Sequence, residues 1–321
     1  MKAIVHHEYG GPDVLELVDV DKPVPSAEEI LVRVRASSVN PVEWYGMTGR
    51  LLVGRVGSGL LKPKEPRLGA DLAGVVEAVG ENVTDFVPGD EVYGGRTGAF
   101  AEYVCVENAV APKPANVTFE QAAAVPIAAL TALQGLRDKG QLRPGQKVLI
   151  NGASGGVGTF AVQIAKALGA EVTGVCCTRN VDQARSLGAD HVVDYTRDDF
   201  TRSEERYDLV LDIAGSRSWS EYRRVLKPDA ILVAVGAPKG GRVLGPLGHV
   251  VKLRLAALRA SQKVVFFIAK LNREDLVYMK ELIEAGAVTP VVERSYPLSE
   301  TADALRYLGE GHSRAKNVIT V

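Results

Sequence analysis

The segment of this chain best suited to bind a ligand is a glycine-dense stretch near its middle. Residues 147–158 read Lys-Val-Leu-Ile-Asn-Gly-Ala-Ser-Gly-Gly-Val-Gly, an apolar run that leads into a tight turn. Residues 159–168 have the pattern of a helix and residues 171–177 form a second apolar run, which together predict a strand–helix–strand unit. Glycine lets the backbone approach a ligand closely, and the free N–H groups at a helix start favour a pyrophosphate. The residues expected to bind a dinucleotide are Ser154, Gly155, Gly156, Val157 and Gly158.

The end of the second predicted strand indicates which dinucleotide is bound. A carboxylate about 20 residues beyond the glycines usually binds the ribose 2′-hydroxyl. Here residues 176–180 read Cys-Cys-Thr-Arg-Asn, and no acid follows before Asp182. A hydroxyl and a guanidinium suit a 2′-phosphate, so Thr178 and Arg179 favour NADPH over NADH. The alternative stays open that Thr178 or Asn180 caps the next helix while Arg179 is a solvated surface residue.

The composition is that of an ordinary globular protein, with 46% hydrophobic and 24% charged residues in a chain of 321. A formal net charge of −1 provides no general attraction for nucleic acid or anionic lipid. No apolar run is long enough to span a bilayer, and the N-terminus has the pattern of a first strand instead of a signal peptide. Three cysteines, two of them adjacent, cannot form a disulfide framework, so we expect a cytoplasmic protein.

Two patterns along the chain predict an α/β protein of two domains. Up to about residue 115, short β-type runs alternate with Gly, Pro and Asn turns, as in a barrel-like β domain. From about residue 118, helices alternate with continuous Val, Ile and Leu runs, which indicates a parallel sheet covered on both faces. We expect a nucleotide-binding domain at 118–269, inserted into a β-rich domain of residues 1–117 and 270–321, with the active site in the cleft between them. The strands expected in the nucleotide-binding domain are 147–150, 171–177, 191–194, 209–213, 231–235 and 264–268, and the helices expected at its start and after it are 119–139 and 273–285.

Four motifs, in this order, give the chain a resemblance to a known family. They are Gly-Gly-Pro-Asp-Val-Leu at 10–15, Ser-Val-Asn-Pro-Val-Glu-Trp at 38–44, Val-Pro-Gly-Asp-Glu-Val at 87–92 and Ala-Ser-Gly-Gly-Val-Gly at 153–158. Together they resemble the zinc-independent quinone oxidoreductases and enone reductases of the medium-chain dehydrogenase/reductase superfamily. The resemblance implies a GroES-like β-barrel domain and a Rossmann-type doubly wound parallel sheet that binds NADPH. It also implies hydride transfer to quinones or α,β-unsaturated carbonyl compounds.

The resemblance further places individual residues near the cofactor. Asn40 and Tyr45 are expected to face the nicotinamide, with Tyr45 as a candidate donor of a proton or hydrogen bond. Thr131 is expected to contact the nicotinamide amide, and Tyr195 to reach the adenosine phosphate. Lys316 corresponds to a lysine in a Gly-Lys ending, although alanine replaces the glycine here.

Structural explanations for several of these residues stay open beside the functional ones. Asn40 and Glu43 form a natural helix start, with Asn as N-cap and Glu three residues later. A threonine inside a helix, such as Thr131, can bond its own turn. Gly215 and Gly236 follow the fourth and fifth strands of the predicted sheet, where such sheets bind ligands, although any turn there can use glycine.

Zinc is not expected. Related zinc enzymes carry Gly-His-Glu where this chain has Gly69-Ala70-Asp71, and no cysteine occurs before Cys105. Residues 92–104 lack the four cysteines of a structural zinc site, and the five histidines are scattered without ligand spacing. Without a metal to polarise it, the hydride acceptor must already be activated, as a quinone or conjugated carbonyl is.

The sequence therefore favours an NADPH-dependent, zinc-free reductase of quinones or α,β-unsaturated carbonyl compounds. An enoyl-thioester reductase and a non-catalytic NADPH-binding or redox-sensing protein are the alternatives. Residues 264–268 are a candidate edge strand for a homodimer, whereas nucleic acid and integral membrane association are not expected. The basic stretch 250–263 is expected to be a helix packed on the nucleotide-binding domain, and residues 50–67 a loop over the cleft.

Overall fold

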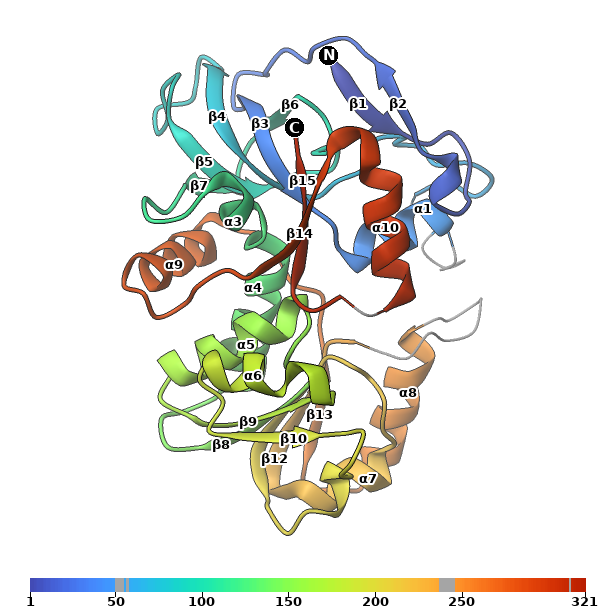
Figure 1. The fold of residues 1–321 in the computed structure, drawn as a ribbon, viewed down its shortest axis with the longest axis vertical. Coiled ribbons are helices and arrows are strands. Elements are labelled where there is room, and N and C mark those ends of the chain that lie inside the picture. Colours follow the sequence, from blue (N-terminus) through green and yellow to red (C-terminus); the bar gives the residue numbers. More distant parts are fainter. Residues whose placement is uncertain (50–54, 56–57, 237–245, 312) are drawn as a thin grey trace. The chain divides into compact units, whose positions relative to one another are not determined.

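The computed structural model describes residues 1–49, 55, 58–236, 246–311 and 313–321 (Figure 1). Contacts divide the chain into two units. Unit 1 comprises Met1–Leu130, Leu271–Gly286 and Pro290–Val321, and unit 2 comprises Thr131–Lys270 and Ala287–Thr289. The first boundary lies after residue 130, later than the predicted residue 117, because helix α3 (Phe119–Ala123) packs against the strands of unit 1.

Unit 1 is built on a mixed β-sheet. Its described strands follow the order β14-β15-β3-β4-β5-β7, and β6 also pairs with β3. The pair β14–β15 is parallel, whereas the pairs that β3, β4 and β5 make with their neighbours are antiparallel. A separate antiparallel pair consists of β1 (Lys2–Val5) and β2 (Glu16–Asp19). The strands of the sheet are β3 (Ile30–Ser38), β4 (Asp71–Val79), β5 (Glu91–Gly95), β6 (Tyr103–Val106), β7 (Val110–Pro112), β14 (Val292–Pro297) and β15 (Lys316–Thr320).

The helices of unit 1 pack against its strands and against one another. Helix α1 (Pro41–Thr48) follows β3 directly, begins after Asn40 and ends at Gly49, which has φ +56°. Helix α10 (Thr301–Glu310) buries an apolar stripe beside α1, and Gly309 lets the two approach, because a Cβ there would lie 2.4 Å from Trp44. Helix α9 (Arg273–Glu284) packs against β7.

Unit 2 has a parallel sheet whose described strands follow the order β10-β9-β8-β11-β12-β13. This order reverses between β8 and β11, and a doubly wound sheet binds ligands outside the carboxyl ends of the strands at such a reversal. Apolar side chains from both faces of the strands are buried, with Leu149, Val210 and Leu232 on one face and Ile150, Leu211 and Val233 on the other. The strands are β8 (Lys147–Asn151), β9 (Glu171–Cys176), β10 (His191–Asp194), β11 (Tyr207–Asp212), β12 (Leu226–Ala234) and β13 (Lys263–Phe266), and the helices α5 (Gly156–Ala167), α6 (Val181–Ser186), α7 (Trp219–Val225) and α8 (Pro246–Ala257).

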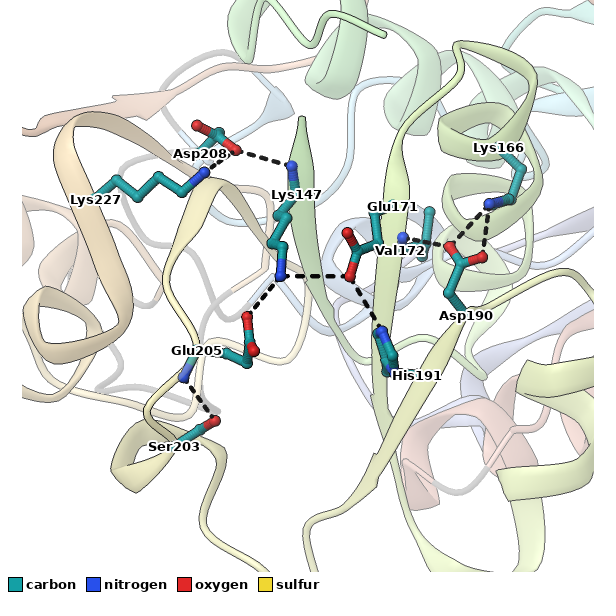
Figure 2. A network of polar contacts seen from close by, with 10 residues as sticks. All are labelled: Lys147, Lys166, Glu171, Val172, Asp190, His191, Ser203, Glu205, Asp208 and Lys227. Atoms are coloured by element: carbon teal, nitrogen blue, oxygen red, sulfur yellow. Dashed lines mark hydrogen bonds and ion pairs between the residues drawn. The ribbon is translucent and has the colours of Figure 1, made fainter. Parts of the chain in front are cut away.

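The amino ends of these strands carry a network of ion pairs (Figure 2). The Nζ of Lys147, at the start of β8, lies 3.5 Å from Glu171 and 2.8 Å from Glu205. His191, at the start of β10, contacts the same Glu171 carboxylate at 3.1 Å. The network thus joins neighbouring strands at the edge opposite the glycine turn, and exposed pairs of this kind contribute little each.

Two predicted helices differ from the observed ones. The segment 119–139 is interrupted before Pro126, where a new helix α4 (Pro126–Leu133) begins and continues into a π-helix (Gln134–Lys139). Proline lacks an N–H and fits the first turn of a helix, which explains the restart. Helix α8 ends at Ala257. Residues 258–262, which we predicted to continue this helix, are therefore not helical. Much of the predicted 50–67 loop, namely 50–54 and 56–57, lies outside the described residues.

Candidate cofactor and active site

The glycine turn of unit 2 joins β8 to α5 as the sequence predicted. Gly152 has φ +99°, a conformation that favours glycine. Gly158 sits in the first turn of α5, where a Cβ would lie 2.0 Å from the carbonyl oxygen of Gly152. Both glycines are therefore required by the fold of the turn itself.

Gly155 differs from them. It is the N-cap of α5 with φ −81°, which any residue can adopt, and a Cβ would meet only the Gly152 oxygen at 3.8 Å. Neither backbone conformation nor packing therefore requires glycine at this position. The first N–H groups of a helix have no intrahelical partner, and an anion bound at them needs a close approach to the backbone. Gly155 thus leaves open space at the start of α5, and the predicted pyrophosphate contact there stays a prediction.

The side chain of Ser154 is held by the next strand–helix connection. Its Oγ accepts a hydrogen bond of 2.9 Å from Nδ2 of Asn180, which is buried between β9 and α6. Ser154, Gly155, Gly156 and Val157 are all partly accessible at the carboxyl edge of the sheet, whereas Gly158 is buried. The structure thus brings the predicted residues of the turn to one edge of unit 2.

Beyond β9, the structure brings an acid to the position predicted for a 2′-phosphate. Thr178 and Arg179 are both exposed, which is compatible with the predicted phosphate contact and with the alternative of a solvated Arg179. The hydroxyl of Thr178 donates a 2.5 Å hydrogen bond to Oδ2 of Asp194, which also lies 3.6 Å from Arg197. Parallel pairing of β9 and β10 places Asp194 beside Cys176, so an acid does adjoin this site although none follows β9 in sequence before Asp182. Thr178 donation and further hydrogen bonds lower the pKa of Asp194, which keeps it ionised.

Gly215 and Gly236 follow β11 and β12, as predicted, but each has a structural reason to be glycine. Gly215 has φ +63°, and its N–H donates to Oδ1 of Asp212 at 2.9 Å. A Cβ on Gly236 would lie 1.8 Å from the oxygen of Ile213. The glycines at these two positions are therefore explained without a ligand. Contact between them and a cofactor stays a prediction.

In unit 1, a buried polar cluster surrounds the start of helix α1. The Nδ2 of Asn40 donates to Oδ2 of Asp71 at 2.9 Å, and its Oδ1 accepts from Nζ of Lys316 at 2.5 Å. Lys316 also donates to the oxygen of Val39 at 3.1 Å and lies 3.6 Å from Asp71. The side chains of Asn40, Asp71 and Lys316 are at most 3% exposed. The cluster thus joins the start of β15, the start of β4 and the start of α1.

Hydrogen bonding and burial together indicate the charge of Asp71, Lys316 and the adjacent Glu43. Asp71 accepts from the Ser38 hydroxyl at 2.6 Å and from the N–H of Ile127 at 2.9 Å in addition to Asn40, a set of donors that matches an ionised carboxylate. The three acceptors around Lys316 match its ammonium, although burial lowers its pKa. Burial first, and the Asp71 charge second, raise the pKa of Glu43 to about 8, so this carboxyl is neutral at pH 7.

These contacts hold the side chains of Asn40 and Lys316 in place within unit 1. Every polar atom of the Asn40 amide is engaged within unit 1, and so is the Lys316 ammonium, so contact of either side chain with a cofactor stays a prediction. Ala315 has φ +152°, so the backbone keeps a conformation that favours glycine even though alanine stands there. Tyr45 is half-buried on α1, and Thr131 is half-buried on α4. Their predicted cofactor contacts are untested, like that of the exposed Tyr195.

The sequence interpretation did not assign Asp71, Glu43 and Ser38 to the site. One signal was present for Asp71, a charged residue that leads directly into the apolar run of β4. Such a residue on a central strand needs a buried partner. Its partner Lys316 is remote in sequence, so no local pattern identifies the pair.

Among the described residues, no group of three or more His, Cys, Asp or Glu side chains is arranged to hold a metal ion. In the part of the chain that the structure describes, no helix has the length and apolar character needed to cross a membrane.

Comparison with known proteins places both halves of the chain. Residues 26–115 match the family model of the alcohol dehydrogenase GroES-like domain, and residues 187–319 match that of the zinc-binding dehydrogenases. The chain is 34% identical to the mitochondrial NAD(P)H oxidoreductase RTN4IP1 of Mus musculus, an alignment that covers 100% of this chain and 89% of the relative. The chain belongs to the quinone oxidoreductase family of the medium-chain dehydrogenase/reductase superfamily.

Other members of the quinone oxidoreductase family are similar along the whole chain. The chloroplastic NADPH-dependent alkenal/one oxidoreductase of Arabidopsis thaliana is 33% identical, over 99% of this chain and 79% of that protein. The Escherichia coli quinone oxidoreductase complexed with NADPH is 26% identical, with a TM-score of 0.85 and 100% of both chains covered. The fold is therefore a GroES-like domain with a Rossmann-type parallel sheet, as predicted. The family model names zinc, whereas this member has Ala70 where the zinc enzymes carry histidine.

Proposed function

We propose that this quinone oxidoreductase family member is an NADPH-dependent reductase that transfers hydride to quinones or α,β-unsaturated carbonyl compounds. The observation that carries the proposal is the turn at Gly155, whose open space is explained by neither conformation nor packing. The names of the similar proteins support it, since they include NADPH, a quinone oxidoreductase and an alkenal/one oxidoreductase.

NADPH, when bound, supplies the hydride. The residues from Ser154 to Gly158 would hold its pyrophosphate at the start of α5, because the helix dipole and N–H groups there favour an anion. Thr178 and Arg179 would bind the 2′-phosphate, with the Arg179 guanidinium supplying charge and fork geometry. The Asp194 carboxylate beside Thr178 opposes this phosphate, which predicts a moderate preference for NADPH rather than an absolute one.

The buried cluster of unit 1 would serve the reaction by fixing helix α1. Lys316 and Asp71 hold the Asn40 amide in one orientation and thereby fix the first turn of the helix that carries Tyr45. Tyr45 remains our candidate proton donor to the reduced acceptor, and solvent is the other source. A Tyr45→Phe variant with unchanged turnover for several acceptors would remove Tyr45 from that role.

The proposal is tested by turnover and by cofactor binding. Oxidation of NADPH and NADH by the purified protein is followed against quinones, enals, enones and an enoyl thioester. Turnover of quinones or conjugated carbonyls is expected, whereas turnover of the thioester alone would identify an enoyl-thioester reductase. NADPH binding without any turnover would support a non-catalytic role.

Gly155→Ala tests directly whether the open space at Gly155 holds the cofactor. The added methyl group fits without a clash, so the free energy of unfolding should change by about 1 kcal/mol or less. It occupies the space proposed for the pyrophosphate, so the Kd for NADPH should rise about tenfold or more. An unchanged Kd would refute the placement of the cofactor at this turn.

Two finer statements belong to the same proposal. We place the protein in the cytoplasm because its three cysteines, two of them adjacent, form no disulfide framework. Since relatives include mitochondrial and chloroplastic proteins, fractionation of the source cells is the test of this placement. We also propose a homodimer that pairs the edge strand β13 with its copy, and light scattering of the purified protein tests it.

A further inference from the structure

Helix α8 of unit 2 carries two apolar stripes, one buried and one exposed (Figure 1). The buried stripe consists of Val250, Leu253 and Ala257, and the last two of these belong to the core cluster of unit 2. The helix also packs against α7 and β13. These contacts fix α8 on the sheet without any contribution from its other side.

The exposed stripe consists of Val251, Leu255 and Leu258, whose exposed fractions are 50%, 62% and 76%. Their spacing places them on one side of a helix. The N–H of Leu258 bonds to the oxygen of Leu255 at 3.4 Å just past the helix end. Single exposed apolar side chains are common on proteins, whereas adjacent ones mark a surface that contacts something apolar. We call these three residues the apolar stripe.

Three exposed cations flank the apolar stripe, namely Lys252, Arg254 and Arg259. At about 3.6 residues per turn, Lys252 lies to one side of the stripe and Arg254 to the other. The Nε of Arg254 donates to the oxygen of Val264 at 3.4 Å, which directs this side chain toward β13. Long basic side chains can lay their stems on apolar surface while the charge stays in a polar layer. We call these three residues the flanking cations.

No acid offsets this charge nearby in the sequence. Residues 246–263 include no Asp or Glu, and the nearest acids are Asp229 and Glu274. Among the described residues, none of the ion pairs includes a flanking cation. The face is therefore locally positive on a chain whose formal net charge is −1. A partner that matches it supplies negative charge beside an apolar layer.

The surface of an anionic membrane has both properties. Its headgroups carry negative phosphates, and the acyl chains begin just beneath them. A helix that lies in this interface inserts its apolar side and keeps its Lys and Arg side chains among the headgroups. Because the buried stripe holds α8 on the sheet, the helix presents a single face, and a flat bilayer can reach it.

Two other partners match this face less well. In a symmetric dimer a patch meets its own copy, so the flanking cations of two copies would face one another without acids between them. Nucleic acid would attract the cations but leave the apolar stripe in water, and the stripe has no aromatic side chain on which bases could stack.

We propose that α8 docks unit 2 on anionic membrane surfaces, with the apolar stripe inserted into the headgroup layer and the flanking cations bound to lipid phosphates. The binding is peripheral and reversible, because three apolar side chains bury too little surface for a permanent anchor. The face belongs to unit 2 and is independent of the proposed reductase activity.

Partition of the intact protein between buffer and vesicles tests the proposal. The protein is sedimented with vesicles of phosphatidylcholine alone or of an equimolar mixture with phosphatidylglycerol, at low and high salt. Partition into the anionic vesicles should exceed that into the neutral ones about tenfold or more, since each cation near such a surface strengthens binding about fivefold. It should also fall as the salt concentration rises. Equal partition into both kinds of vesicle, or none into either, would overturn the proposal.

Matched variants locate the face that binds. Leu255→Ser should lower partition into anionic vesicles about tenfold, whereas Val24→Ser, at an apolar position of unit 1 that is 86% exposed, should not. Arg259→Glu should lower it about tenfold or more. Arg143→Glu makes the same change of charge at an exposed position elsewhere in unit 2 and should have much less effect. Wild-type partition in both Leu255→Ser and Arg259→Glu would overturn the proposal.

A fluorescent reporter shows whether the apolar stripe itself enters the bilayer. The emission of the Leu258→Trp variant should shift to shorter wavelengths when anionic vesicles are added, because the indole leaves water. Val24→Trp is the control and should show no shift. Both variants keep the native Trp44 and Trp219, so the difference between them reports on the added indole. An unshifted emission of vesicle-bound Leu258→Trp would refute the insertion of the stripe.

Light scattering separates membrane docking from self-association through the same stripe. Leu255→Ser should leave the molar mass in solution unchanged, because the proposed homodimer pairs β13 and does not use the exposed face of α8. A change from dimer to monomer in this variant, together with no vesicle binding by the wild type, would assign the apolar stripe to a second copy of the chain and overturn the proposal.

Discussion

Replacing Glu43 by glutamine should remove a large pH dependence from the stability of unit 1. In the native structure burial and the Asp71 charge raise the pKa of Glu43 from 4.5 to about 8. The unfolded chain releases this proton near pH 4.5, whereas the folded chain retains it up to about pH 8. The contribution of the protonated Glu43 to the free energy of unfolding is therefore fully present below the pKa of the unfolded chain, and it is lost as the pH rises toward the pKa of the folded chain.

The magnitude follows from the width of that window. Each pH unit between the two pKa values lowers the free energy of unfolding by about 1.4 kcal/mol, or about 5 kcal/mol over the whole window and about 3 kcal/mol at pH 7. The groups that face Glu43 are Asp71 on β4, Lys316 on β15 and Asn40 at the helix start. Glutamine keeps an acceptor for the Asn40 N–H and does not titrate. The free energy of unfolding of Glu43→Gln therefore lacks the pH dependence that Glu43 causes.

The assay uses the different tryptophans of the two units. Trp44 lies in unit 1 and Trp219 in unit 2, so urea unfolding of a Trp219→Phe background reports on unit 1 through Trp44 fluorescence. The difference in unfolding free energy between Glu43→Gln and the parent should grow by about 1.4 kcal/mol per unit from about pH 5 to about pH 7.5. Glu16→Gln, at an exposed position of β2, is the matched control. A constant difference across this range would refute the assignment of a neutral, buried carboxyl to Glu43.

Further changes have outcomes that follow from the same structure. Lys316→Met leaves the Asp71 carboxylate buried without its cation and should cost about 3–5 kcal/mol in urea unfolding, while an unchanged midpoint would contradict the ion pair. Asp194→Asn removes the anion beside Thr178 and should raise the ratio of NADPH to NADH affinity about tenfold. Arg179→Ala should lower this ratio, because it removes the guanidinium proposed to bind the 2′-phosphate. A ratio that neither change affects would disprove the 2′-phosphate assignment. Gly158→Ala forces a Cβ to within 2.0 Å of a carbonyl oxygen, so the melting temperature should fall where that of Gly155→Ala does not. Lys147→Met breaks the exposed network of Figure 2 and should cost less than about 1 kcal/mol, with a loss of several kcal/mol arguing for strong coupling within it.

The sequence predicts the architecture well where the signal is local and periodic. The apolar runs of the parallel sheet and the turn at Gly155 are found where the pattern indicates, since a βαβ unit encodes its own strand, turn and helix. The helix break at Pro126 was missed because the many alanines and leucines around it favour a helix and one proline at a first turn gives a weak signal.

The site is less predictable because its partners are remote in sequence. The pair Asp71–Lys316 joins two strands of one sheet, and Asp194 adjoins Thr178 because of a parallel strand pair. Proximity of this kind depends on which strands become neighbours in the sheet, and the hydrophobic periodicity of a single strand does not specify its neighbours. The neutral state of Glu43 depends on burial by the whole unit, so a capping motif was the most that the sequence could indicate.

The position of Lys316 on β15 also affects the order in which the two units can fold while the chain is being synthesised. Asp71 on β4 leaves the ribosome early, and the strand that supplies its cation follows only after unit 2 has been made. Until β15 adds to β3, the sheet of unit 1 lacks its compensating charge and the strand that joins β14 to it. Unit 2 is then the first to complete its core during translation, and unit 1 waits for its final strand. A chaperone that recognises unfinished sheets would meet the β3 edge of unit 1 in the newly made chain.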